Sequence, residues 1–146
     1  MARDIRIALV GFGPTLANMG ITGAIGMAYI LAVGGELNGP VIGAILTVVG
    51  FSAFGKHPHN IVPIMLGVFF ASMLKDWSAD DPSAVLAALF GTTLAPIAGR
   101  FGWRWGIVAG FVHSSVAQTV GQLHGGLVLY NNGFAAGLVA AILVPV

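Results

Sequence analysis

Residues 7–35 read IALVGFGPTLANMGITGAIGMAYILAVGG, and no charged side chain interrupts this stretch. A helix that crosses a bilayer needs roughly 20 consecutive, mostly apolar residues. The stretch is longer than that, and Arg6 and Glu36 mark its two ends. It therefore predicts a membrane-spanning helix near the N-terminus. A cleaved signal peptide is the alternative interpretation, but the run is longer than the hydrophobic region of such a peptide.

The composition of the whole chain points to the same environment. Of the 146 residues, 57% are hydrophobic and 8% are charged, and the mean hydropathy is +0.93. A soluble domain carries about 25% charged residues, so these charges are too few to cover a water-facing surface. The 22 glycines also fit a membrane protein, because small residues let helix backbones touch in lipid. There is no cysteine for a disulfide, and the net charge of +1 gives no sign of nucleic-acid binding.

Further apolar runs follow the first one along the chain. They predict an all-α, polytopic transmembrane helix bundle of about six hydrophobic segments, with residues 1–146 as a single integral membrane domain. Two of the runs are short for a span, so re-entrant or broken segments are the alternative there. Thr92, Thr93 and Pro96 predict a bend in one of these two. The further runs are 37–55, 61–74, 84–99 and two within 105–146 that meet at the polar stretch 121–126.

The charges at the segment ends are unevenly distributed. When the segments alternate in direction, one side of the membrane receives five cations and the other receives four acids and a single cation. Cytoplasmic loops carry an excess of Lys and Arg, so we expect a bacterial inner-membrane protein with both termini in the cytoplasm. The first set is Arg3, Arg6, Lys56, Arg100 and Arg104, and the second is Glu36, Lys75, Asp76, Asp80 and Asp81.

Two short motifs recur in the same order along the chain. FGPTLA at 12–17 returns as FGTTLA at 90–95, and NGPVIG at 38–43 returns as NGFAAG at 132–137. The shared order predicts two weakly similar halves, which are residues 5–74 and residues 84–146. Chance similarity in a chain rich in glycine and alanine is the alternative. Because the second half ends soon after its Asn-Gly motif, we expect it to be truncated or part of a longer protein.

The fifth segment carries a stripe of residues spaced four apart. Residues at this spacing share one face of a helix. The glycines predict close backbone contact with a neighbouring helix. The polar end predicts either hydrogen bonds in a packing seam or the wall of a solute path. His113 flanks this end, and an ionisable residue inside a membrane is a functional candidate, as is His124. The stripe consists of Gly102, Gly106, Gly110, Ser114, Gln118 and Gln122.

The two Asn-Gly motifs stand where helices are expected to begin. Asn38 and Asn132 are favourable N-cap residues, which is the structural interpretation. The functional interpretation places both helix N-termini, together with Asn131, at a binding site, as broken helices do in transporters. Gln118 and Asn132 are expected at similar depth on neighbouring antiparallel helices. They therefore predict a shared, partly hydrated interior site, with His113 or His124 beside it.

Other kinds of chemistry leave little trace in the sequence. The loop 56–60 (KHPHN) contains two histidines, but no cysteine or carboxylate is close enough in sequence to predict a metal site. It is expected either to contact lipid headgroups or to gate a pore. The sequence contains no zinc-protease, serine-hydrolase or P-loop motif. We therefore expect no enzymatic activity, no cofactor and no ATP-driven transport.

Two stretches resemble a known family. Residues 89–103 (LFGTTLAPIAGRFGW) and 129–137 (LYNNGFAAG) are similar to a bacterial membrane family with tandem repeats, domain-of-unknown-function family 1576. The resemblance covers most of the chain and implies a longer protein, but it brings no activity and no functional residues. A looser similarity, over short stretches, is to urea-transporter-like channels, which also have duplicated halves. Their paired pore-helix motif is not evident here.

These features together predict a membrane channel or secondary transporter for a small, uncharged polar solute. A non-transporting structural or assembly subunit, packed against partner chains through its glycine faces, is the alternative, and an intramembrane enzyme ranks third. The expected partners are the lipid bilayer, the solute and further chains of a homo-oligomer or complex. Candidate lining residues are Asn38, His113, Ser114, Gln118, Gln122, His124, Asn131 and Asn132, and candidate packing residues are Gly102, Gly106 and Gly110.

Overall fold

The computed structural model of the chain describes residues 11–123 and 130–144. All regular secondary structure in these residues is helical, which confirms the all-α prediction, and six helical segments follow one another in the predicted order. The fourth segment is divided by a 3-10 turn. The elements are α2 (Phe12–Val33), α3 (Gly39–Ser52), α4 (Pro58–Leu74), α5 (Pro82–Gly91), η1 (Thr92–Leu94), α6 (Ala95–Phe101), α7 (Trp103–Leu123) and α8 (Asn131–Leu143).

The segments differ in their capacity to cross a bilayer. In the described residues, two helical stretches have both the length and the apolar character for a full crossing, namely α2 and the continuous stretch Pro82–Phe101. The apolar helices α3, α4 and α8 are shorter. α7 is long enough, but its polar residues lower its hydropathy. Two helices, rather than six, therefore satisfy the simplest criterion for a membrane span.

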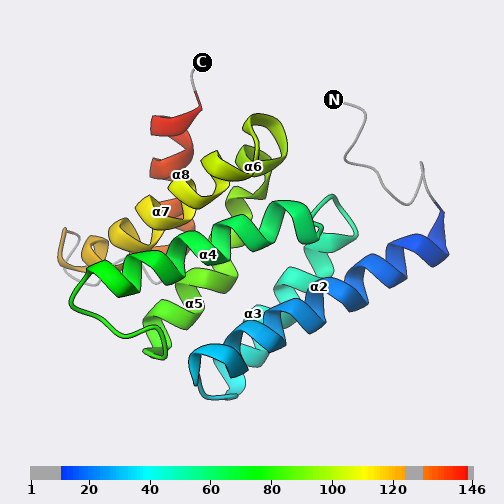
Figure 1. Cartoon of the computed structure of the whole chain (residues 1–146), viewed down its shortest axis with the longest axis horizontal. Helices are drawn as coiled ribbons and strands as arrows, with labels where there is room; N and C mark the ends of the chain where they lie inside the picture. The colour runs from blue at the N-terminus through cyan, green and yellow to red at the C-terminus, as the bar shows by residue number, and fades with distance from the viewer. Residues whose placement is uncertain (1–10, 124–129, 145–146) are drawn as a thin grey trace.

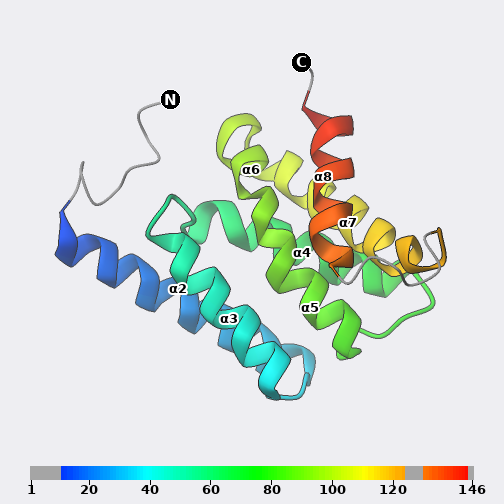
Figure 2. The same ribbon diagram turned by 180° about the vertical axis from the view of Figure 1, so that it is seen from behind.

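The helices form two groups that lie side by side (Figures 1 and 2). α2 and α3 run antiparallel along one side of the molecule, and α6, α7 and α8 lie together on the other. α4 packs against α7 over a longer stretch than any other described pair. α5 connects the two groups, because it contacts α3 on one side and α4, α7 and α8 on the other.

The contact between α4 and α7 is made by backbone atoms. A Cβ atom added at Gly67 would overlap the carbonyl oxygen of Ile107. One added at Gly110 would overlap the carbonyl oxygen of Ile64. Glycine is therefore required on both helices at this crossing, since any side chain would push the two backbones apart.

Gly106 extends this contact by one turn of α7. A Cβ atom there would lie 2.7 Å from Cβ of Ala98 and 2.8 Å from Cβ of Pro63. The prediction that Gly102 continues the same seam is wrong. Gly102 stands in the turn between α6 and α7 with a φ of 96°, and no atom lies within 4 Å of its added Cβ. Its role is conformational, because side chains rarely adopt positive φ.

The break in the fourth segment confirms the predicted bend. The hydroxyl of Thr92 donates to the carbonyl oxygen of Leu89 at 2.6 Å, and Pro96 stands in the first turn of α6. Proline lacks a backbone N–H and so cannot continue the regular hydrogen bonding across the break. Nζ of Lys56 reaches the same hydroxyl oxygen of Thr92 at 2.8 Å. The loop between α3 and α4 therefore lies against the break.

Polar side chains hold α2 to this loop within an otherwise apolar surface. The hydroxyl of Thr22 donates to the hydroxyl oxygen of Ser52 at 2.7 Å. Nδ2 of Asn18 donates to the backbone oxygens of Ser52 and Lys56 at 3.0 and 2.7 Å. In addition, Nδ2 of Asn60 donates to the Gly55 oxygen at 3.1 Å. The polar cluster 56–60 is thus an ordered connection bonded to α2.

The two copies of each repeated motif occupy different places in the structure. Phe12 opens α2, whereas Phe90 lies near the end of α5. Asn38 caps α3 by accepting from the Val41 backbone N–H at 3.1 Å. Asn132, in contrast, lies within the first turn of α8. The internal repeat therefore stays a prediction.

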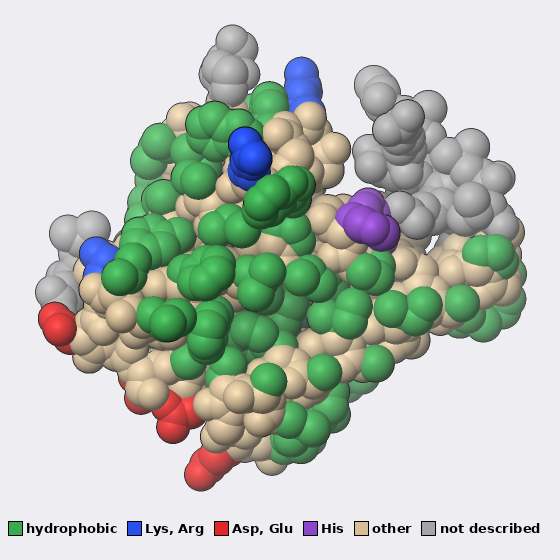
Figure 3. All heavy atoms as spheres, viewed as in Figure 1, with side chains coloured by type: hydrophobic (Ala, Val, Ile, Leu, Met, Phe, Trp, Pro, Cys, Tyr) green, Lys and Arg blue, Asp and Glu red, His purple; other side chains and the backbone are tan. Residues whose placement is uncertain are grey.

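Every helical segment exposes large apolar side chains. The space-filling view shows a broad hydrophobic face with few charges in its middle (Figure 3). Soluble monomers rarely expose contiguous apolar surface of this kind. Examples from each segment in order are Phe12 and Leu31, Leu46 and Phe51, Met73 and Phe70, Phe101, Trp103 and Trp105, and Leu138 and Ile142.

Candidate functional site

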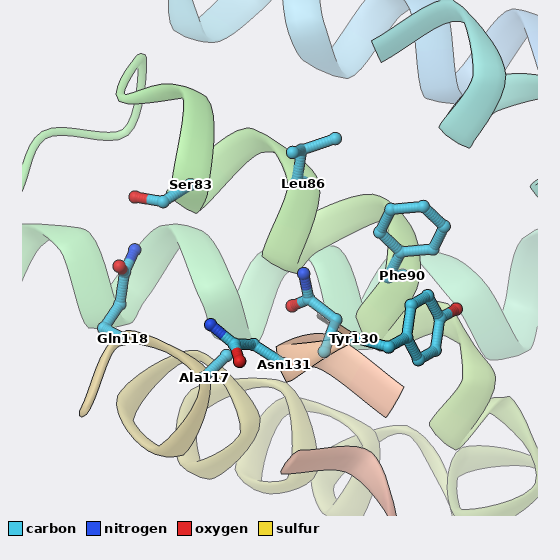
Figure 4. Close-up of a pocket in the computed structure, with 8 residues that line it drawn as sticks. Ser83, Leu86, Phe90, Ala117, Gln118, Tyr130 and Asn131 are labelled. Atoms are coloured by element: carbon cyan, nitrogen blue, oxygen red, sulfur yellow. The ribbon is translucent and has the colours of Figure 1, made fainter. Parts of the chain in front are cut away.

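A pocket of about 280 Å³ lies between α5, α7 and the first turn of α8. Its side chains come from all three helices, and Gln118 on α7 points toward Ser83 on α5 (Figure 4). Part of the wall is apolar and part consists of hydroxyl and amide groups. Among the described lining residues none carries a charge. They are Ser83, Leu86, Phe90, Ala117, Gln118, Tyr130, Asn131 and Asn132.

Buried polar atoms without a partner gather in and beside this pocket. Within the described part of the chain, no hydrogen bond reaches Nε2 of Gln118, Oδ1 of Asn132, the hydroxyl oxygen of Ser114 or either ring nitrogen of His113. Each such atom costs about 1–3 kcal/mol, and native structures contain few of them. Their concentration on α7 and α8 is therefore more typical of a binding site than of a passive core.

His113 is fully buried beside the pocket. The Asn132 side chain and the Ala87 backbone face its ring, but neither meets the geometry of a hydrogen bond. Gly91 provides the space for the ring, since a Cβ atom there would lie 2.8 Å from Cδ2 of His113. The imidazole thus links the end of α5 to the first turn of α8, at the break in the fourth segment.

Two aromatic rings close one side of the pocket. Phe90 and Tyr130 meet edge to face, with 5.8 Å between ring centroids and 69° between ring planes. This geometry is favourable for aromatic pairs. A Cβ atom at Gly133 would overlap the Tyr130 ring, so the glycine lets the ring lie against the start of α8. The aromatic pair gives the pocket a flat apolar wall.

A family model described as "Protein of unknown function (DUF1576)" matches residues 5–146. The chain belongs to this family. The matched range includes the pocket, the break in the fourth segment and the α4–α7 crossing. No curated protein matches the chain. No solved structure matches it either. The looser similarity to urea-transporter-like channels finds no support in these comparisons.

The charged groups of this DUF1576 chain occupy two opposite ends of the bundle. In Figure 3 the acidic side chains lie along the lower left and most basic ones near the top. The connections α2–α3 and α4–α5 carry Glu36, Asp76, Asp80 and Asp81, with Lys75, whereas α3–α4 and α6–α7 carry Lys56, Arg100 and Arg104. The pocket lies at the acidic end, because it involves the first turns of α5 and α8 and the last part of α7.

Lys56 differs from the other charged residues at the basic end, because it is largely buried. Desolvation lowers the pKa of Lys56 to about 8. Its Nζ lies 5.2 Å from the centroid of the Phe51 ring, in addition to the hydrogen bond with Thr92. Arg100 and Arg104 are exposed at the same end. Lys56 therefore couples the α3–α4 connection to the break rather than facing open solvent.

The structure brings together part of the predicted lining set. Gln118, Asn131 and Asn132 line the pocket, while His113 and Ser114 are buried on α7 with unpaired polar atoms. The proposal that Asn38 lines the same site is wrong, because its side chain is used to cap α3. Gln122 lies in the last turn of α7, but its side chain and the whole of His124 fall outside the described residues.

Half of the pocket wall was not anticipated from the sequence. Ser83, Leu86 and Phe90 come from α5, a helix that is remote in sequence from α7 and α8. Tyr130 directly precedes the Asn-Gly motif, and its neighbours provided the one available signal. Leu86 and Ala117 are ordinary apolar residues in apolar helices. Only the packing of α5 across α7 and α8 gives them a role.

Proposed function

We propose that the chain is a membrane-embedded transport protein whose pocket between α5, α7 and α8 binds a small, uncharged polar solute. The observation that carries this proposal is the group of unpaired, buried polar atoms from α7 and α8 at a pocket of about 280 Å³. Ligand pockets typically combine apolar walls with a few convergent polar groups. A solute can supply the hydrogen bonds that the protein itself leaves unmade.

The membrane location is supported by the exterior of the molecule. Large apolar side chains are exposed on all six helical segments, including the short ones. Lipid is the solvent in which such a surface is stable. The short helices α3 and α8 can still lie across the apolar layer when the bilayer thins locally around them. We therefore propose a multi-pass inner-membrane protein with lipid around the whole bundle.

The orientation is proposed from the charges at the two ends. Lys56, Arg100 and Arg104 mark the cytoplasmic end by the positive-inside rule, so the pocket at the acidic end faces outward and both termini face the cytoplasm. Because the chain has no cysteine, single variants Ser78→Cys and Gly102→Cys can test this directly. An impermeant thiol reagent should label them from opposite sides. Labelling of both from one side would contradict the orientation.

The two halves of α7 favour a carrier over a permanently open channel. Its polar half lines the pocket, but its glycine half touches the α4 backbone with no room for a side chain. A solute in the pocket thus meets a closed contact in the direction of the basic end. Transport then requires α4 and α7 to separate, as in alternating access.

Osmotic swelling of liposomes tests the proposal. Liposomes that contain the wild-type chain should take up small neutral solutes faster than protein-free liposomes, and salts should give no such increase. Asn132→Leu, in the pocket, should lose the increase. Thr119→Val, at an exposed position one residue after Gln118, should keep it. Equal swelling with and without protein for every neutral solute would contradict transport.

A structural or assembly subunit is the second candidate, and a different surface favours it. Small residues that share one face of α2 are all exposed, and no atom lies within 4 Å of a Cβ added at Gly13 or Gly20. Such faces pack against other helices in membranes. This face consists of Gly13, Ala17, Gly20, Ala24 and Ala28. Under this alternative, bulky substitutions on it should change the oligomeric state, and pocket variants should have no effect on solute uptake.

A further inference from the structure

The geometry points to a primary carboxamide as the group that the pocket recognises, an inference that rests on the proposed solute pocket. Nε2 of Gln118 can only donate, and Oδ1 of Asn132 can only accept. Both atoms are buried and lack a partner in the described part of the chain, and both residues line the pocket. The wall therefore presents one free donor from α7 and one free acceptor from α8.

A carboxamide complements this pair. Its carbonyl oxygen can accept from Nε2 of Gln118, and its N–H can donate to Oδ1 of Asn132. The two groups lie on one planar edge of the molecule, so both hydrogen bonds form without leaving a polar atom of that edge unpaired. Buried polar atoms without partners are costly, and a ligand that pairs both removes the cost on both helices at once.

The remainder of the wall limits what can be attached to the amide. Leu86, Phe90 and Ala117 offer no side-chain donor or acceptor, and the Phe90–Tyr130 pair presents flat ring surfaces. A short apolar or planar substituent fits against these groups. A polyol does not, because some of its hydroxyls would face apolar side chains without a hydrogen-bond partner.

Charged analogues of an amide are disfavoured by the same wall. No described lining residue carries a charge, so a carboxylate or a guanidinium would be buried without a counter-ion. A carboxylate would also place a second acceptor against Oδ1 of Asn132. The pocket should therefore distinguish acetamide from acetate, which has nearly the same shape.

Ligand-observed saturation-transfer NMR on the full chain in lipid nanodiscs tests the inference. Acetamide should give a saturable signal. N,N-dimethylacetamide, which retains the carbonyl but has no N–H, should bind about tenfold more weakly, as expected for one lost hydrogen bond. Acetate and glycerol should give no saturable signal. Equal affinity for acetamide and its dimethyl analogue, or tighter binding of glycerol, would overturn the inference.

Variants assign the binding to the two amides. Gln118→Leu and Asn132→Leu should each weaken acetamide binding about tenfold. Gln118→Glu, which replaces the donor with an acceptor, should weaken it as well. Thr119→Val is the matched control and should bind as wild type. Unfolding temperatures in the same nanodiscs show that the variants are folded. Unchanged acetamide affinity in folded Gln118→Leu and Asn132→Leu would overturn the inference.

The same measurements separate this inference from the proposed function. Acetamide binding that depends on Gln118 and Asn132, without solute flux into liposomes, would refute transport and support amide recognition. Flux of neutral solutes that is lost in Asn132→Leu, without preference for amides, would support transport and refute amide recognition.

Discussion

One stripe of residues spaced four apart runs the length of α7, but its two halves pack in opposite ways. At the first half, Gly106 and Gly110 bring α7 into contact with α4 and α6, and no space remains for a side chain. At the second half, Gln118 lines a pocket of about 280 Å³, and the nearby polar atoms of Ser114 and His113 have no partner within the described residues.

The difference shows how side-chain size divides one helix into a structural part and a candidate functional part. Where the residues are glycines, backbones approach and dispersion contacts are dense. Where they become polar and larger, the neighbouring helices stand further off and a cavity remains. Stability should therefore depend mainly on the glycine half, and solute binding on the polar half. Each prediction below contrasts these two halves or the regions attached to them.

The largest effect is expected at the glycine half. Gly110→Ala places a Cβ against the carbonyl oxygen of Ile64, so the α4 and α7 backbones must separate. We expect a loss of roughly 3 kcal/mol or more of unfolding free energy, measured as a lower Tm in detergent. Gly43→Ala, on an exposed face of α3 with no atom within 4 Å, should be neutral or slightly stabilising. Equal Tm values for the two variants would contradict the proposed contact.

A smaller loss is expected at Gly91, where the neighbour is a side chain. The Cβ in Gly91→Ala would lie 2.8 Å from Cδ2 of His113, and the buried ring has little room to move. The expected cost is about 1–3 kcal/mol. His113→Ala removes the ring, so the double variant should recover most of the Tm lost by Gly91→Ala alone. A strictly additive double-mutant cycle would show that the two residues are not coupled.

At the polar half, substitution should separate stability from function. Gln118→Leu removes a buried, unpaired donor, so the unfolding free energy should stay the same or increase by about 1 kcal/mol. Uptake of small neutral solutes into liposomes should nevertheless fall. This pattern is the reverse of that expected for Gly110→Ala. A clear decrease in Tm for Gln118→Leu would mean that Nε2 has a partner in the folded protein.

The smallest effect concerns the connection that contacts the break. The pKa of Lys56 is lowered to about 8 in the folded chain, against 10.5 for an ordinary lysine. Between these two pH values the unfolded chain binds more protons, so the stability of the folded chain rises with pH. Lys56→Met should lose this rise, and its Tm relative to wild type should fall as pH increases across the window. Lys75→Met, at an exposed lysine, should keep the wild-type pH dependence.

Several features were predictable because they depend on residues close in sequence. Runs without charge located all six helical segments, and Thr92 with Pro96 located the break in the fourth. The capping role of Asn38 follows from its residue type and position. The seam formed by Gly106 and Gly110 follows from their spacing, whereas Gly102 needed its positive φ to be recognised as a turn residue.

Tertiary structure alone decided which surfaces meet. The sequence determined that α7 has one face of glycines followed by polar residues, because helical periodicity fixes which side chains share a face. It did not determine that Gly67 completes the glycine contact, or that Ser83, Leu86 and Phe90 complete the pocket. Those pairings join helices distant in sequence, and they depend on how closely each pair of surfaces can approach. Periodicity describes one helix, whereas a pocket exists only between several.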